Sequence, residues 1–237
     1  ITIGGPGFEI ASIIKDWTFK QDYQWFANDK HNVKFGFNIL THKISPGGIN
    51  SIDPDGVIAD LNVQDKRSVE GAAYLLDEWK ISNRISANYG LRYSSFYAIG
   101  EQDVYSYNEN GEIEDTTYYG KNEVFQKYNG LEPRIAVTWM LNEYSSMKAS
   151  FSRGDQYLHL LSNSTTSSPT DIWMPSSNNI KPQLSDQFTV GYFRNFKDNT
   201  YEFSVESYYK PMNNLIDYKT GAEVLLNEFV EAELVYG

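Results

Sequence analysis

Short and long connections between extended segments alternate along the whole chain, and this alternation restricts its fold more than any other feature. The short connections are rich in Asn and Asp, as tight β-hairpins require. They fall at residues 27–31, 81–84, 141–145 and 197–200, whereas long polar connections occupy residues 43–68, 98–128, 155–183 and 212–226. Because each hairpin reverses the chain, we expect the long connections at one end of an antiparallel sheet and the short ones at the other.

The extended segments between these connections repeat with a period of two. Along residues 85–93 the apolar side chains stand at Ile85, Ala87, Tyr89, Leu91 and Tyr93, and the polar ones include Ser86, Asn88 and Arg92. A helix cannot produce this period. Similar alternation marks residues 17–25, 33–39 and 201–206, and further strands are expected at 69–80, 129–140, 146–153, 185–196 and 227–236. The sequence therefore predicts about nine strands, each with an apolar and a polar face.

A transmembrane β-barrel explains this pattern better than a compact soluble domain. Loops beyond about 12–15 residues are uncommon in compact domains, whereas outer-membrane barrels combine short periplasmic turns with long extracellular loops. The mean hydropathy of -0.50 fits a barrel, because only alternate residues of each strand face lipid. Aromatic residues form 15% of the chain and concentrate near the expected strand ends, where barrels place their interfacial girdles. The predicted class is all-β: an antiparallel transmembrane β-barrel segment of about nine strands.

Charge and residue types argue against several other functions. A net charge of -11 disfavours a nucleic-acid partner, because phosphate binding needs clustered Lys and Arg. The chain has no Cys, and His31, His42 and His159 lack the spacing of a metal site. Glu202 and Glu206 share one face of a strand but lie about 13 Å apart along it, too far for an acid–base pair. We therefore expect no enzyme activity, no cofactor and no bound metal.

Three segments resemble those of a known family. Residues 74–93 contain DEWK at the end of one strand, a tight turn, and GLRY at the end of the next. Residues 179–192 contain a Lys-Pro-x-x-Ser opening before a strand, and residues 131–137 contain a Pro-Arg opening. These segments resemble barrel segments of TonB-dependent outer-membrane receptors, and the resemblance covers most of residues 69–210.

The resemblance implies a barrel of about 22 strands around an N-terminal plug domain, with energy delivered by the TonB complex. It implies that residues 1–237 form one partial β-barrel domain, with the plug domain and the remaining barrel strands outside this segment. The expected location is the outer membrane of a Gram-negative bacterium. The expected partners are outer-membrane lipid, the protein's own plug domain, the TonB complex acting through that plug, and a small nutrient ligand.

On this resemblance the chain is expected to belong to a receptor for active uptake of a scarce nutrient, such as a siderophore, cobalamin or a glycan. Polar residues of the strands would face the lumen and contact the plug or line the transport path. These lumen-facing candidates are Lys34, Asn38, Asn88, Arg92, Lys148, Glu202 and Glu206. The resemblance does not identify the transported ligand.

The connection at residues 155–183 is the best candidate for ligand binding. It mixes aromatic rings with amide, imidazole and carboxylate groups, and loops held by a rigid scaffold often carry binding residues. The candidate ligand-binding residues are Tyr157, His159, Asn163, Asp171 and Trp173. In the alternative interpretation, Leu158, Leu160 and Leu161 only pin this loop over the barrel mouth, and the polar groups are solvated.

Two other functions remain open on the sequence. A soluble extracellular β-sandwich could serve as a carbohydrate-binding or adhesion module, burying its apolar faces internally where a barrel exposes them to lipid. A passive porin would share the strand pattern. A barrel needs detergent or lipid in solution and a β-sandwich does not, so detergent dependence distinguishes the two. A plug and a TonB box in the upstream sequence would distinguish a receptor from a porin.

Overall fold

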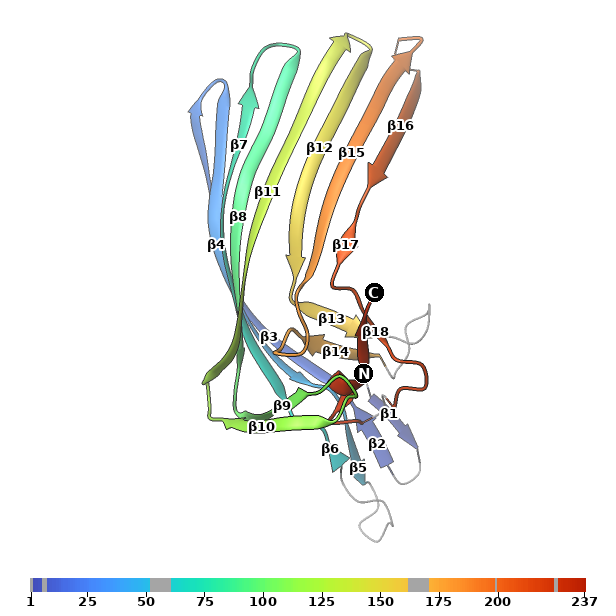
Figure 1. The fold of residues 1–237 in the computed structure, drawn as a ribbon. Coiled ribbons are helices and arrows are strands. Elements are labelled where there is room, and N and C mark those ends of the chain that lie inside the picture. The colour runs from blue at the N-terminus through green and yellow to red at the C-terminus, as the bar shows by residue number, and fades with distance from the viewer. Residues whose placement is uncertain (1, 6–7, 52–60, 162–170, 199, 224–225) are drawn as a thin grey trace.

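The computed structural model describes residues 2–5, 8–51, 61–161, 171–198, 200–223 and 226–237 (Figure 1). Long antiparallel strands dominate it and form one nine-stranded sheet. In chain order its strands are β3 (Ile13–Asn28), β4 (His31–Ser45), β7 (Lys66–Lys80), β8 (Ile85–Ile99), β11 (Val124–Asn142), β12 (Ser145–Gln156), β15 (Gln183–Phe196), β16 (Tyr201–Tyr209) and β17 (Met212–Asn213). From β3 to β16 each strand pairs with the next of these, and β17 pairs with β15 beyond the end of β16. The predicted all-β class is confirmed, and eight of the nine predicted strands are strands of the main sheet.

The short turns gather at one end of this sheet and the long connections at the other, as predicted (Figure 1). Local hydrogen bonds explain the turns. The Asn28 side-chain oxygen accepts the backbone N–H groups of Lys30 at 2.8 Å and His31 at 3.1 Å. Lys197 and Asp198 adopt left-handed φ values of 47° and 51° in the four-residue connection between the paired residues Phe196 and Tyr201, and the Thr200 N–H donates to the Lys197 carbonyl at 3.0 Å.

The register gives the sheet one polar and one apolar face. Directly paired residues point to the same side, so the pairs Lys34–Leu76 and Leu76–Gly90 carry one face across β4, β7 and β8. The ladders continue this polar face to β16, and all seven lumen-facing candidates lie on it: Lys34, Asn38, Asn88, Arg92, Lys148, Glu202 and Glu206. The opposite face carries exposed Phe19, Leu75, Leu91, Ile135 and Phe203.

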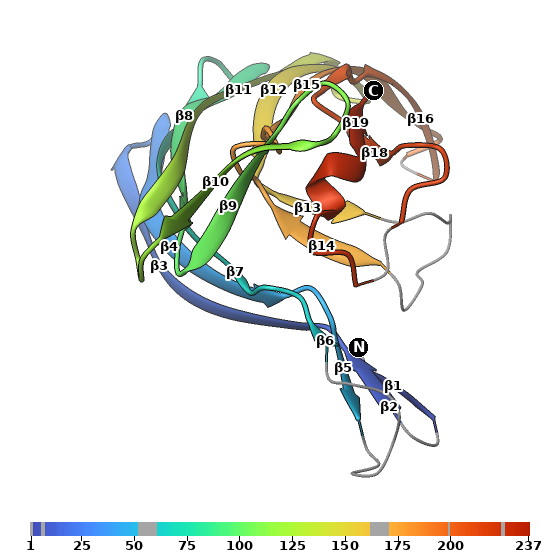
Figure 2. The ribbon, with the colours of Figure 1, turned by 60° about the horizontal axis from the view of Figure 1, so that its bottom comes forward.

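The sheet is curved, with the polar face on its concave side. Figure 2 shows the strands arching around segments that come from the long connections. Phe96 and Ala98, which follow Arg92 on the polar face of β8, are each 1% exposed because these segments pack on them. The apolar face is therefore convex and points away from the rest of the molecule.

The long connections and the two ends of the chain contain strands of their own, which the sequence did not predict. Four small strands, β1 (Thr2–Gly5), β2 (Phe8–Ala11), β5 (Gly48–Ser51) and β6 (Leu61–Asn62), form one sheet. Three two-stranded sheets pair β9 (Gln102–Tyr107) with β10 (Ile113–Tyr119), β13 (Leu158–Leu161) with β14 (Ile172–Pro175), and β18 (Ile216–Tyr218) with β19 (Leu234–Tyr236). The main strands also run beyond the expected ends: β11 has 19 residues, whereas a barrel strand needs about 9–11 to cross a bilayer.

The predicted strand at residues 227–236 is wrong. Residues Val230–Glu233 form a 3-10 helix (η1), and only Leu234–Tyr236 form a strand, β19, which pairs with β18 outside the main sheet. The reason is the burial of Val230, which packs with Leu161, Ile172, Met174 and Ile180 in an apolar cluster. The ninth strand of the main sheet is instead β17, which follows Pro211. Among the described residues, no helix is long and apolar enough to cross a membrane.

Candidate functional site

Segments from the long connections pack on the concave face near the loop end and leave the rest of it bare. We call these segments the cover, and they comprise the described residues of 100–123, 157–182 and 214–237 (Figure 2). Under the cover, Ser94 is 0% exposed and Ser68 is 1% exposed. Towards the turns, Asn88 and Lys148 are exposed on the same face. The concave face is therefore divided into a covered loop-end half and an open turn-end half.

Tyr157 fastens the cover to the wall of the sheet. Its ring stacks on Phe96 with the centroids 5.0 Å apart, and its hydroxyl lies 2.8 Å from the Ser94 hydroxyl. The side chain is 4% exposed. Burial raises the pKa of Tyr157 to about 12, so the hydroxyl stays protonated and able to donate a hydrogen bond. The structure therefore places this candidate ligand residue in a packing contact.

His159 is also buried, on the β13–β14 ladder. Its Nε2 lies 3.0 Å from the Ser176 hydroxyl, and its ring is 3% exposed opposite Met174. Burial lowers the pKa of His159 to about 4, so the imidazole is neutral at physiological pH. A neutral, enclosed imidazole supports the packing of the cover and offers no positive charge to an anionic ligand.

The remaining candidates on this connection differ in accessibility. Asp171 is 8% exposed at the start of β14. Trp173 pairs with Leu160 on the other face of the same ladder and is partly exposed, as Leu160 is. Leu161 is buried in the apolar cluster, whereas Asn163 lies outside the described residues. Of the four described candidates, only Trp173 presents accessible surface.

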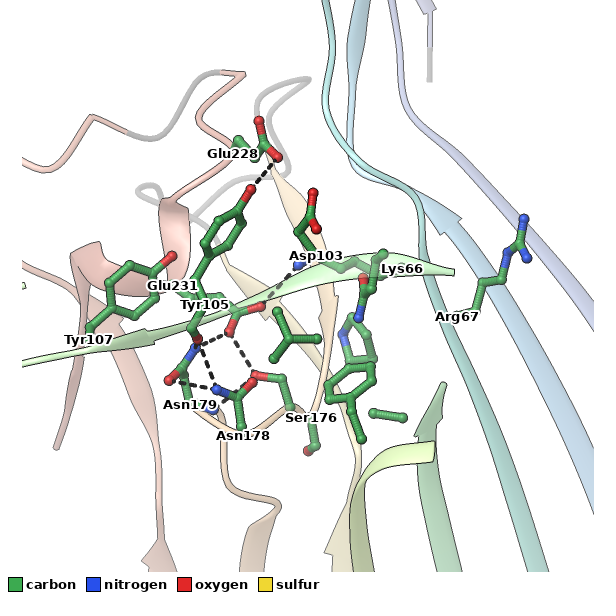
Figure 3. A pocket seen from close by; sticks show the side chains of 16 residues that line it. Lys66, Arg67, Asp103, Tyr105, Tyr107, Ser176, Asn178, Asn179, Glu228 and Glu231 are labelled. Atoms are coloured by element: carbon green, nitrogen blue, oxygen red, sulfur yellow. Dashed lines mark hydrogen bonds and ion pairs between the residues drawn. The ribbon is translucent and has the colours of Figure 1, made fainter. Parts of the chain in front are cut away.

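A buried carboxylate joins the parts of the cover (Figure 3). Glu231 in η1 accepts hydrogen bonds from the Asn179 amide and the Ser177 hydroxyl, both at 2.8 Å, and lies 3.3 Å from the Lys66 ammonium. The Glu231 side chain is 7% exposed and the Lys66 side chain 12% exposed. Burial by itself raises the pKa of Glu231, but the Lys66 charge and the two hydrogen bonds outweigh it and hold the pKa below its ordinary value.

Tyr105 links a further segment to this group. Its backbone carbonyl accepts hydrogen bonds from the side-chain amides of Asn178 and Asn179, both at 2.9 Å. Its hydroxyl donates to Glu228 at 3.0 Å, and its ring meets Phe229 edge-on. Burial and the bond to Glu228 raise the pKa of Tyr105 to about 12.

Little space remains between these side chains. The open volume they enclose is ≈ 10 Å³, about the room that one buried water requires. Its lining includes Gln102, whose buried side-chain oxygen has no hydrogen-bond partner among the described residues. The enclosure is therefore suited to a single water and far too small for a nutrient, which needs about 300 Å³ or more.

The open half of the concave face is lined by charged and amide groups. At the border with the covered half, Arg92 lies 3.2 Å from both Glu70 and the buried Glu132, which pairs the arginine across three neighbouring strands. The Lys34 ammonium contacts Glu78. At the turn end, an open groove of ≈ 850 Å³ is lined by residues 28–32 of the first turn, by Glu78, Trp79 and Lys80, and by Asn88. This half has room for another protein segment or a solute.

The remaining lumen-facing candidates lie on the same concave face. Lys148 places its ammonium 4.3 Å from the centre of the Phe193 ring. Asn38 pairs with Lys20 and Ala72, and Glu202 and Glu206 are exposed on the edge strand β16. No group of three or more His, Cys, Asp or Glu side chains that could hold a metal ion occurs in the described ranges.

Sequence reasoning missed the residues that organise the cover. Tyr105, Asn178 and Asn179 lie in segments expected to be plain loops, and Glu231 lies in the segment expected to be a strand. The run of Ser and Asn at residues 176–179 was an available signal, because these side chains readily bond to backbone groups and to carboxylates. Nothing local in the sequence indicated that Lys66 would be the ionic partner of Glu231.

Comparisons with known proteins agree with this geometry. A family model described as "TonB dependent receptor-like, beta-barrel" matches residues 7–229. None of the curated proteins matches the sequence. Similar solved structures include the alcaligin outer-membrane receptor FauA from Bordetella pertussis, with 13% identity, a TM-score of 0.50 and coverage of 92% of this chain and 32% of that one.

Two further solved structures have the same relation to the chain. The copper transporter OprC is 11% identical with a TM-score of 0.58, over 88% of this chain and 32% of its own. The ferric-catecholate import receptor Fiu from E. coli K12 is 12% identical with a TM-score of 0.53, over 90% of this chain and 33% of its own. At these identities the likeness shows a shared fold. The chain spans about a third of the length of each of the three proteins.

Proposed function

Because the chain belongs to the TonB-dependent receptor-like β-barrel family, we propose that it forms part of the wall of an outer-membrane receptor that takes up a scarce nutrient. The observation that carries this proposal is the two-faced sheet. Its convex face exposes large apolar side chains, and its concave face is polar and partly covered by the long connections. This is the distribution that lipid outside and an aqueous lumen inside require.

The rest of the barrel and the plug domain are part of the same proposal. The two strands at the ends of the sheet order, β3 and β16, are exposed along their lengths. Unpaired strand edges are unfavourable in lipid, because their N–H and C=O groups have no water to bond to. Further strands of the full-length protein pair with these edges, and residues 1–237 act as one partial barrel domain.

The plug domain contacts the open half of the concave face, and the solute passes along it. Its groove of ≈ 850 Å³ and its unburied lumen-facing residues offer the hydrogen-bonding groups that such a partner needs. Plug movement is driven by the TonB complex, and the protein is not an enzyme. We propose a siderophore, cobalamin or a glycan as the solute; of these, the siderophore is supported by the alcaligin receptor FauA and the ferric-catecholate import receptor Fiu, which share the fold.

The alternatives are less well supported. A soluble β-sandwich buries its apolar face against a second sheet, yet in the described ranges Trp17 is 80% exposed and Phe19 58% exposed on the convex face. A passive porin shares the barrel wall but belongs to a different functional class from the family that this sequence matches. A receptor is the function that accounts for both the sheet and the family.

Whole-cell topology and uptake test the proposal together. Epitope tags inserted in the full-length protein at Asn110, in the cover, should be detected on intact cells, whereas a tag at Asn83 should not. Cells that lack the receptor or TonB should lose growth on one of three limiting nutrients: a ferric siderophore, cobalamin or an oligosaccharide. Surface exposure of the Asn83 tag, or growth unaffected on all three, would contradict the proposal.

Within the cover, ligand contact is proposed for Trp173, supported by its partial exposure among the buried candidates. Replacing Trp173 with Ala in the full-length receptor should weaken nutrient affinity by about 1 kcal/mol or more if the indole is an anchor. Leu160→Ala is the matched control, because Leu160 is the cross-strand partner of Trp173. Equal affinities of the two variants and the native receptor would assign Trp173 a structural role.

A further inference from the structure

The cover is assembled from pieces that lie far apart in the sequence, and they meet at one side chain. Lys66 is the first residue of the main-sheet strand β7, Tyr105 belongs to the second long connection, and Ser177 and Asn179 belong to the third. Glu231 follows the fourth and contacts Lys66, Ser177 and Asn179 directly, while Asn179 carries the network to Tyr105 (Figure 3). One carboxylate therefore ties the wall strand β7 directly to the third long connection, and through Asn179 indirectly to Tyr105 of the second.

Neighbouring contacts hold the segment that carries this carboxylate in place. The Lys219 ammonium donates to the backbone carbonyl of Ala232 at 2.6 Å. The Tyr236 hydroxyl donates to the carbonyl of Asn179 at 2.7 Å and accepts the N–H of Lys181 at 2.9 Å. Val230 inserts into the apolar cluster of β13 and β14. The η1 segment and its neighbours are thus held to the rest of the cover by polar contacts and by the apolar contact of Val230.

We infer that Glu231 is a latch: its network keeps the cover closed over the concave face, and breaking that network frees the cover to open towards the loop end. A carboxylate that is 7% exposed is tolerated only while it stays paired. Removing it leaves the largely buried Lys66 ammonium without a counter-charge, so water enters to solvate it. The open volume beside the latch is ≈ 10 Å³, which is too small to hold a nutrient.

One consequence of this inference rests on the proposed uptake function: the latch must release before a nutrient reaches the open half. The closure itself depends on the contacts alone. Glu228 provides a matched control, because it lies in the same segment but is exposed, and among the described residues its side chain accepts a hydrogen bond from the Tyr105 hydroxyl. Losing Glu228 should leave the cover closed.

Cysteine labelling measures the opening directly. These 237 residues contain no Cys, so once any Cys elsewhere in the full-length receptor is replaced by Ser, Ser176→Cys provides a single thiol, at a position of the cover that is 0% exposed. The full-length receptor carrying this substitution is treated on whole cells with a membrane-impermeant maleimide. Labelling should be slow in the S176C receptor, faster by at least about tenfold when Glu231→Ala is added, and unchanged when Glu228→Ala is added instead.

The barrel must remain folded for this comparison, which heat resistance in gel electrophoresis checks. If Glu231→Ala does not reach the cell surface, Glu231→Gln replaces it, because the amide keeps the side-chain volume and loses only the charge paired with Lys66. Labelling of E231Q or E231A that is as slow as in the S176C parent would overturn the latch. No nutrient is needed for the labelling, so faster labelling in a receptor that transports nothing would reject the uptake function and keep the latch.

Discussion

The covered and open halves of the concave face lie on the same strands but differ in what stabilises them. On β8, Phe96 and Ala98 near the loop end are each 1% exposed, whereas Asn88 on the same face near the turns is exposed. The loop-end half is packed as a protein interior is, with stacked rings and a paired buried carboxylate. The turn-end half presents charges and amides to open space. One sheet therefore supports a closed structural region and an accessible polar surface, separated along its strands.

The largest expected effect contrasts one residue from each half. Phe96→Ala removes a fully buried ring that stacks on Tyr157, so we expect the cover to lose about 3–5 kcal/mol of stability. Asn88→Ala on the same strand and face should change stability by less than about 0.5 kcal/mol. Hydrogen exchange of residues 157–161 in the full-length receptor measures both. Similar exchange in the two variants would remove the distinction between the halves.

The next largest effect is expected on the convex face, where a substitution can be compared with one on the open half of the concave face. Tyr89→Arg places a charge where we expect lipid and should destabilise the barrel by about 2–4 kcal/mol if the residue lies near the bilayer midplane. Asn88→Arg, one residue away on the concave face, should be tolerated. Urea unfolding of the full-length protein in lipid vesicles compares the two. A tolerated arginine at position 89 would argue that this face is not lipid-exposed.

Acid should affect the covered half more than the open half. The pKa of His159 is lowered by burial to about 4 from an unfolded value of 6.5. Its contribution to stability is therefore complete above pH 6.5 and declines as the pH falls towards 4, because the unfolded segment then binds the proton more readily. The loss should approach about 2–3 kcal/mol. Hydrogen exchange against pH would show a weaker acid response in His159→Gln, and an unchanged response would exclude His159 as its source.

A single hydroxyl gives the smallest effect. Tyr157→Phe keeps the stack on Phe96 and removes the hydrogen bond to the Ser94 hydroxyl, which then remains buried without that partner. The cover should lose about 1 kcal/mol. Tyr93→Phe is the control, because the Tyr93 hydroxyl bonds to Asn129 at an exposed position. The same hydrogen-exchange measurement should separate the two variants, and equal losses would show that burial does not decide the strength of these contacts.

The sequence predicted the open half far better than the covered half. A strand such as residues 85–93 is recognisable by its period of two, which depends only on neighbouring residues and on which face meets lipid. The turns at Asn28 and at Lys197–Asp198 are equally local. The sheet order, the turn end and the shared face of the polar residues therefore follow from the amino-acid sequence alone.

The cover depends on contacts between distant segments, and no local pattern encodes them. Glu231 and Lys66 are 165 positions apart, and the mixture of apolar and acidic residues around Glu231 resembled an alternating strand. Tyr157 and His159 have the side chains of ligand-binding residues, yet burial gives them packing roles. Residue type alone could not distinguish a binding side chain from one that holds the cover in place.

The most direct test of the central claim is a nitroxide scan along β8 of the full-length receptor in lipid bilayers. Spin labels at Ile85, Ala87, Leu91 and Tyr93 should collide mainly with lipid-soluble oxygen, and labels at Ser86, Asn88 and Arg92 mainly with a water-soluble nickel complex. Gly90 is left out, because a Cβ there would lie 2.5 Å from the Leu75 carbonyl oxygen. A two-residue period with this phase is the predicted result. Equal collision rates at all positions, or the opposite phase, would contradict a lipid-facing convex surface and the receptor that depends on it.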